Sequence, residues 1–64
     1  MTKLEQTAKY YVEARSARNA ASAKNDFMSR DMKEQELAYW ADSLECEMKR
    51  TQTPFDTVRA MING

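Results

Sequence analysis

Between Lys3 and Thr51 the sequence contains neither glycine nor proline. Alanine, glutamate, lysine, arginine, methionine and glutamine dominate this stretch, and all of them favour helix over other conformations. The whole chain of 64 residues has a single glycine and a single proline. We therefore predict an all-α fold.

Two short motifs predict where the later helices begin. The order Asp-Met-Lys-Glu at 31–34 fits a capping box. In such a box the Asp31 carboxylate accepts from a free backbone N–H of the first turn, and the Glu34 side chain accepts from the backbone N–H of Asp31. Further along, Thr53 stands at a cap position, and Pro54 follows at the first helical position, where a missing N–H costs nothing. The polar segment before the first motif indicates a turn within 25–30.

We expect one small helical domain over residues 1–64, with helices at about 3–24, 31–51 and 54–63. The two long helices match in length, at roughly 30 Å each for a rise of 1.5 Å per residue. Matched lengths and a short connection favour an antiparallel helical hairpin, with the short C-terminal helix folded across its open end. A single unbroken helix through residue 51 is the alternative.

A domain of this size has few means of stabilisation. Folding buries only roughly 60% of the surface that a chain of this length exposes when unfolded, and such a core rarely supplies more than about 3–5 kcal/mol. One cysteine, Cys46, and no histidine leave neither a disulfide nor an imidazole metal ligand. We therefore expect self-association, as a homodimer in the form of a dimeric helical bundle.

The same composition argues against several classes of function. Without histidine there is no side chain that titrates near neutrality unperturbed and no Ser-His or Cys-His pair, so we expect no enzyme, cofactor or metal site. No apolar run approaches the roughly 20 residues of a membrane span, and the first residues lack the apolar core of a signal peptide. We expect a cytoplasmic protein.

The net charge of zero conceals an uneven distribution. Residues 1–25 carry five basic and two acidic side chains, a net charge of +3, whereas residues 26–48 carry two basic and seven acidic side chains, a net charge of −5. Opposite charge on two helices commonly sets how they pair, within one hairpin or between two copies. The other interpretation is that one of the charged surfaces is a binding face.

The second helix has two apolar faces. One set of residues follows the i, i+3, i+4, i+7 spacing of a core stripe: Leu37, Trp40, Ala41, Leu44 and Met48. A second set falls on nearly the opposite side: Met28, Met32, Tyr39 and Cys46, with Gln35 among them. Either the third helix covers part of this second face with Phe55, Val58, Met61 and Ile62, or the face is an interface.

The first helix carries small side chains where a core helix would carry leucine. Tyr10, Ala14, Ala17 and Ala21 line one side at three- and four-residue spacing, which allows another helix to approach closely. An adjacent sector begins with apolar residues and becomes basic and hydrogen-bonding toward the C-terminus. This sector is a candidate recognition stripe: Tyr11, Arg15, Arg18, Ser22 and Asn25.

Together these observations favour a small non-catalytic protein–protein interaction module. We expect a regulator or inhibitor of the kind that phage, plasmid and other mobile-element genes encode, docking helical faces onto a larger partner protein. The expected partner-binding residues are Tyr11, Arg15, Arg18, Ser22, Asn25, Met28, Met32 and Tyr39. The alternative is a dimeric RNA- or DNA-binding bundle that uses the basic face of the first helix.

The first eight residues, MTKLEQTA, and the pair Glu34-Gln35 soon after the expected turn resemble the Rop (Rom) family of plasmid proteins. The resemblance implies antiparallel hairpins that dimerise into a four-helix bundle and bind paired RNA loops. The sequence departs from that pattern at the inward positions Arg15, Asn19 and Ser22, where an apolar layer is required, and in its extra helix after Pro54.

Overall fold

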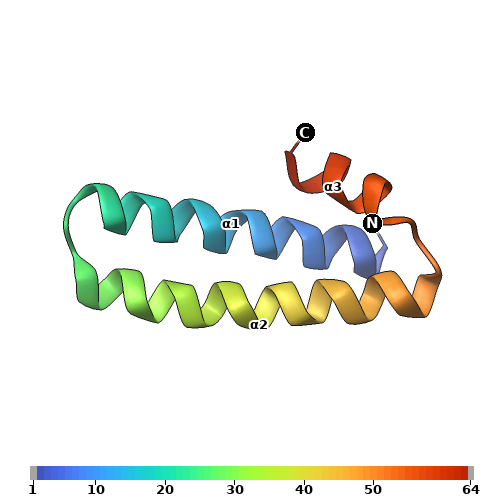
Figure 1. The fold of residues 1–64 in the computed structure, drawn as a ribbon, viewed down its shortest axis with the longest axis horizontal. Helices are drawn as coiled ribbons and strands as arrows, with labels where there is room; N and C mark the ends of the chain where they lie inside the picture. The colour runs from blue at the N-terminus through green and yellow to red at the C-terminus, as the bar shows by residue number, and fades with distance from the viewer. Residues whose placement is uncertain (1, 64) are drawn as a thin grey trace.

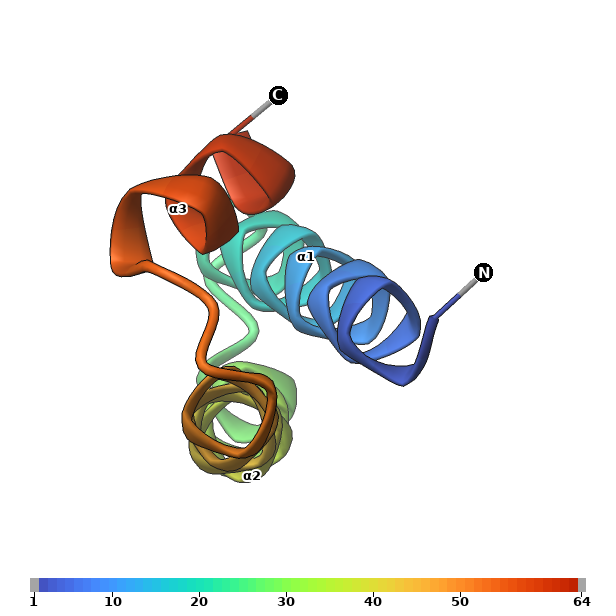
Figure 2. The same cartoon turned by 90° about the vertical axis from the view of Figure 1, so that its right-hand side faces the viewer.

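The computed structural model describes residues 2–63 and consists of three helices: α1 (Lys3–Ala23), α2 (Phe27–Thr51) and α3 (Phe55–Asn63). The two long helices lie antiparallel and side by side, and α3 turns back along the N-terminal part of α1 (Figure 1). The all-α prediction is confirmed, and α1 packs against α2 as expected for a hairpin. The end-on view shows α1 between α2 and α3 (Figure 2).

The turn between α1 and α2 is tighter than the sequence suggested. Asn25 adopts a left-handed conformation with φ of 58°, and the backbone N–H of Asp26 donates to the carbonyl of Ala21 at 3.0 Å while that of Asn25 donates to Ser22 at 3.1 Å. This pair of bonds is a Schellman motif, which satisfies the last carbonyls of a helix and reverses the chain. The hairpin therefore turns at 24–26.

The predicted start of the second helix at Asp31 is wrong. Asp26 caps α2 instead: its side chain accepts from the backbone N–H of Ser29 at 3.2 Å, and hydrogen bonding from the side chain of Ser29 and from this N–H lowers the pKa of the Asp26 carboxyl. Asp31 lies inside α2 and pairs with Arg30 at 3.3 Å. Both aspartates can accept from a backbone N–H as helix caps. The Schellman turn ends α1 at Ala23 and reverses the chain by Asp26, so Asp26 is the residue at the start of α2.

The start of α3 differs from the prediction by one residue. The carbonyl of Pro54 accepts from the N–H groups of Thr57 and Val58 at 3.1 and 3.3 Å, so Pro54 precedes the helix rather than opening it. The Thr53 hydroxyl does not cap α3, since it lies 2.7 Å from the hydroxyl of Thr51. The chain turns between α2 and α3 at Gln52, whose φ is 56°.

The core lies at the open end of the hairpin, where all three helices meet. Its buried members are Leu4 and Ala8 of α1, Leu44 of α2 and Val58 of α3, and the partly buried Tyr11, Met48 and Ile62 pack around them. Toward the turn the contact between α1 and α2 depends on small residues, with Ala14 buried and Ala17 and Ala21 partly buried. The two ends of the hairpin are thus packed with side chains of very different size.

The predicted core side of the second helix is correct for Leu44, with Leu37, Trp40 and Met48 partly buried beside it. The rings of Trp40 and Tyr10 pack with their centroids 4.8 Å apart, which joins the middle of α1 to the middle of α2. Ala41, predicted to be in the core, is exposed. It borders an open groove between α2 and α3 that the two long helices cannot fill.

An ion-pair cluster at Glu47 holds the ends of the two long helices in register. Lys3 Nζ of α1 lies 3.4 Å from Glu47 Oε1, and Arg50 Nε donates to Glu47 Oε2 at 3.0 Å. Glu47 is only 8% exposed, and the hydrogen bonds from Arg50 hold the pKa of its carboxyl below the usual 4.5. The expected attraction between the helices is therefore local: among residues 2–63, the ion pairs that join α1 to α2 are Lys3–Glu47 and Arg18–Glu34.

The lowered pKa of Glu47 predicts acid-sensitive stability. A carboxyl whose folded pKa lies below its unfolded pKa stabilises the fold above the unfolded value, and this contribution is lost as the pH falls through the folded value. We expect Glu47→Gln to lower the free energy of unfolding at pH 7 by more than it does at pH 3, as measured by urea denaturation at both pH values. An equal effect of the substitution at the two pH values would show that the Glu47 charge contributes nothing.

Candidate functional site

The recognition stripe expected on α1 is divided by the fold. Tyr11 is half-buried against the core, and the guanidinium of Arg15 lies 5.7 Å from the centre of its ring. Arg15 Nη2 also donates to the backbone carbonyl of Ile62 at 2.7 Å, which places a cation at the C-terminal end of α3. A cation there satisfies a free carbonyl and faces the negative end of the helix dipole. Arg15 therefore joins α1 to α3.

The rest of the stripe lies toward the turn and makes different contacts. Arg18 Nε donates to the side chain of Asn19 at 3.2 Å, and Arg18 Nη1 lies 4.0 Å from Glu34 of α2. Ser22 is exposed, and Asn25 is the left-handed residue of the turn. The structure thus places the five stripe residues in three settings, namely the α1–α3 junction, a weak cross-helix ion pair and the turn. Their role in partner binding stays a prediction.

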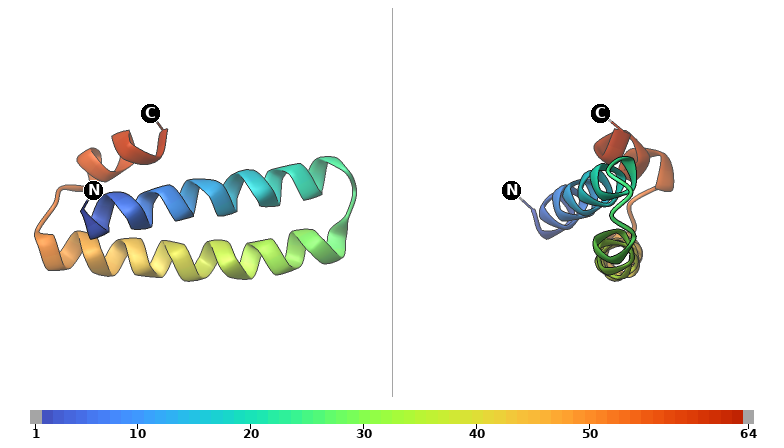
Figure 3. Two further views of the ribbon diagram at one scale, coloured as in Figure 1. Left: turned by 180° about the vertical axis from the view of Figure 1, so that it is seen from behind. Right: turned by 90° about the vertical axis from the view of Figure 1, so that its left-hand side faces the viewer.

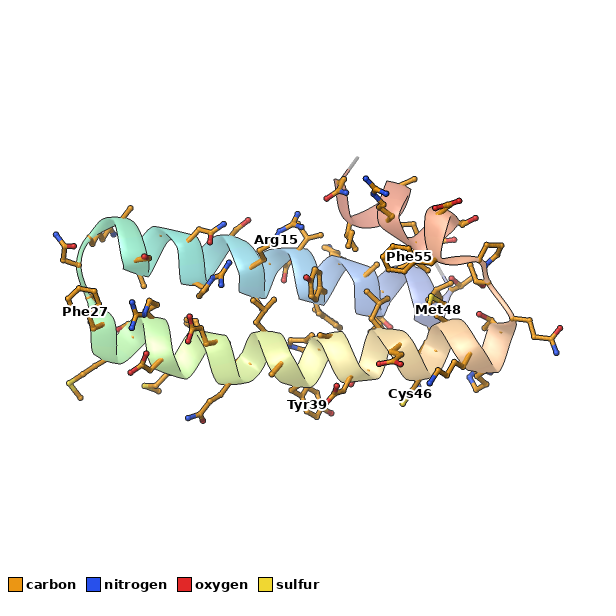
Figure 4. The ribbon with its side chains drawn as sticks, in the orientation of Figure 1. Arg15, Phe27, Tyr39, Cys46, Met48 and Phe55 are labelled. Carbon is orange, nitrogen blue, oxygen red and sulfur yellow. The ribbon has the colours of Figure 1, made fainter. Side chains whose placement is uncertain are left out.

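The second expected face, on α2, is an exposed row of side chains. Met28 is 82% exposed, Met32 64% and Tyr39 63%, and Cys46 continues the row toward the end of the helix. The labelled side chains of Tyr39 and Cys46 project from the side of α2 that faces away from α1 (Figure 4). We call Met28, Met32, Tyr39 and Cys46 the outer row of α2.

The third helix does not cover the outer row. It packs on α1, and Val58 and Ile62 reach the core while Phe55 and Met61 stay partly or largely exposed. The views from behind and from the turn end show α3 beside α1, away from the outer side of α2 (Figure 3). Of the two alternatives for this face, cover by the third helix is therefore wrong for residues 2–63.

A groove between the three helices was not expected from the sequence. It has a volume of about 370 Å³ and is lined by Tyr11, Ala41, Leu44, Glu45, Met48, Phe55, Val58 and Ile62. Phe55 is 62% exposed and projects from α3 on the side of Met48 (Figure 4). The sequence indicated an apolar side of α3 but not the groove, because the walls of the groove come from all three helices. We call it the three-helix groove.

The described residues contain neither a metal-binding cluster nor a membrane-spanning helix. No three cysteine, aspartate or glutamate side chains among residues 2–63 come together to hold a metal ion. None of the three described helices is long and apolar enough to cross a membrane.

No protein-family model, curated protein or solved structure matches this chain. The candidate site is therefore the pair of exposed apolar surfaces, the outer row of α2 and the three-helix groove.

The contact between Arg15 and Ile62 predicts a local effect of losing the guanidinium. We expect Arg15→Gln to weaken the docking of α3 by about 1 kcal/mol, because a charge-assisted hydrogen bond and a helix-dipole contact are lost. This corresponds to roughly fivefold faster amide hydrogen exchange in α3, measured by mass spectrometry, with little change in α1.

Arg18→Gln is the matched control, since Arg18 belongs to the same stripe but contacts Asn19 and Glu34 rather than α3. It should leave exchange in α3 unchanged. If Arg15→Gln also left exchange in α3 unchanged, the guanidinium would not hold α3, and the side chain would be free for recognition.

Proposed function

We propose that this protein is a non-catalytic protein–protein interaction module, a small regulator or inhibitor that docks the outer row of α2 onto a larger partner protein. The observation that carries this proposal is the exposure of three large side chains, Met28, Met32 and Tyr39, in one row on the side of α2 that faces away from α1. A large exposed apolar surface marks an interaction site more often than it marks an ordinary solvated face.

The chemistry of the outer row suits contact with another protein. Methionine side chains are flexible and polarizable, so they adapt to a foreign surface, and tyrosine is enriched at the centres of interfaces. Met32, Tyr39 and Cys46 are spaced seven residues apart, Met28 precedes Met32 by four residues, and Gln35 lies between Met32 and Tyr39 on the same side. This is the spacing of a seam that receives another helix.

Self-association is the second part of the proposal, and the three-helix groove is the surface that supports it. The groove is mostly apolar, and its charged neighbours, Glu45 on the α2 side and Arg15 beside Tyr11 on α1, have opposite signs. Two copies that bring their grooves together therefore bury apolar surface without opposing like charges. A homodimer would also support a core of only a few buried residues.

Nucleic-acid binding through α1 has less support. Arg15 is bonded to α3 and Arg18 lies near Glu34, so two of the stripe's cations already have partners within the chain. Residues 26–48, which comprise the cap Asp26 and most of α2, carry a net charge of −5, which repels phosphates.

A photocrosslinking residue at Tyr39 tests the role of the outer row. We expect the probe at Tyr39 to cross-link to the larger partner in an extract of the source cells, and the same probe at Ala20, an exposed position on α1, to give no such product. With the purified partner, Met32→Ser/Tyr39→Ser should weaken binding by about 2 kcal/mol or more, as expected for anchors at an interface. Unchanged affinity of this variant would contradict the proposal.

A separate experiment tests self-association through the three-helix groove. Multi-angle light scattering at tens of micromolar should give about twice the chain mass of 7.4 kDa. Phe55→Ser should shift the protein toward the monomer, because Phe55 is the most exposed apolar residue of the groove, whereas Tyr39→Ser should not. A monomeric wild-type protein, or equal effects of the two variants, would refute the groove as the dimer interface.

A further inference from the structure

We propose that the partner segment received by the outer row of α2 is an amphipathic helix whose apolar seam is flanked by lysine or arginine. This inference rests on the proposed function of the outer row and adds the chemistry of the partner to it. It is carried by the charges that border the row.

The length and spacing of the row fit a helix as the bound segment. The row runs along most of α2, a single helix of 25 residues from Phe27 to Thr51. Its side chains repeat every seven residues on one side, which matches the knobs that a second helix presents when it crosses at a shallow angle. A loop or a single inserted side chain would cover only one or two of these positions.

Acidic side chains border the central part of the row. On the helical wheel of α2, Asp31 and Asp42 lie beside Met32, Tyr39 and Cys46, and both carboxylates are exposed; the exposed Glu45 lies farther round the helix, toward the three-helix groove. Each cation near this part of α2 already contacts an acidic side chain. Arg30 pairs with Asp31 at 3.3 Å, an exposed pair that another cation can replace at little cost, and Lys33 pairs with Glu36 at 3.4 Å.

Asp42 makes this border clearly negative. It lies on the outer side of α2 between Tyr39 and Cys46 and forms no ion pair with any cation of residues 2–63. Glu45 has Lys49 at 3.1 Å, an exposed pair that another cation can replace at little cost. A helix that covers the row therefore places its flanking residues next to carboxylates, and basic flanks are the complementary choice.

A second copy of this chain is a poor occupant of the row. Two α2 helices packed along their outer rows would bring together two segments, residues 27–48 of each copy, that each carry two basic and six acidic side chains, a net charge of −4. Like charges placed opposite one another at an interface are strongly unfavourable. The charge pattern thus directs the row toward a different, basic partner.

Two designed peptides of about three heptads test the inference. Both carry leucine at the seam positions, and their flanking positions are lysine in one and glutamate in the other. Each peptide carries a fluorophore, and its affinity for the full-length protein is measured by fluorescence anisotropy at physiological ionic strength. We expect the lysine peptide to bind at least about tenfold more tightly than the glutamate peptide. Added salt should narrow this difference.

Two variants separate charge selection from apolar docking. Asp31→Asn/Asp42→Asn should reduce the preference for the lysine peptide by at least about threefold, whereas the matched control Glu5→Gln/Glu13→Gln, which removes two exposed carboxylates of α1, should not. Met32→Ser/Tyr39→Ser should weaken binding of the lysine peptide by about tenfold or more, because the seam is lost.

Several results would overturn the inference. Equal binding of the two peptides, with loss of both in Met32→Ser/Tyr39→Ser, would refute a basic partner while leaving the outer row as a docking site. Binding of the lysine peptide that survives Met32→Ser/Tyr39→Ser would show attraction to the acidic surface alone. No binding of either peptide would refute a helical partner, whereas the photocrosslinking experiment at Tyr39 tests the proposed function independently.

Discussion

The packing of Leu44 against Leu4, Ala8 and Val58 is the contact on which the other parts of the structure depend. It is the place where all three helices meet, and it lies at the end of the hairpin that no turn closes (Figure 1). The ion pair between Lys3 and Glu47 lies at this same end and fixes the register of α1 and α2. Because α3 completes this core from the α1 side, it cannot also cover the outer face of α2.

The sequence allowed the helical class, the pairing of the long helices and the core side of α2 to be predicted. These features follow from the absence of glycine and proline before residue 51 and from the spacing of Leu37, Trp40 and Leu44. Asp31 was predicted as the cap and this was wrong, because Asp26 also has the right side chain and only the turn geometry selects between them. Local motifs alone do not contain that information.

The candidate site was predicted in part. The parts of it that the sequence did not predict depend on contacts between residues that are distant in sequence. Met28, Met32 and Tyr39 were expected to be free if the third helix did not cover them, and they are exposed. Arg15 was placed in the recognition stripe, and its contact with α3 could not be predicted. The hydrogen bond from Arg15 to the carbonyl of Ile62 spans 47 positions and uses a backbone atom. No periodicity in the sequence reports such a contact, and the three-helix groove was missed for the same reason, since its walls come from all three helices.

The distribution of side-chain size along the hairpin links its stability to its proposed binding. Near the turn, α1 offers α2 mainly alanine, so this half buries little apolar surface and is held less strongly than the half that contains Leu44. Met28 and Met32 of the outer row stand on this weaker half of α2. A helix bound along the row adds apolar contact where the hairpin has least of its own, and a ligand that binds only the folded state stabilises that state by mass action. If the outer row binds the proposed partner helix, that helix would therefore add apolar contact to the half of α2 that has least of its own against α1.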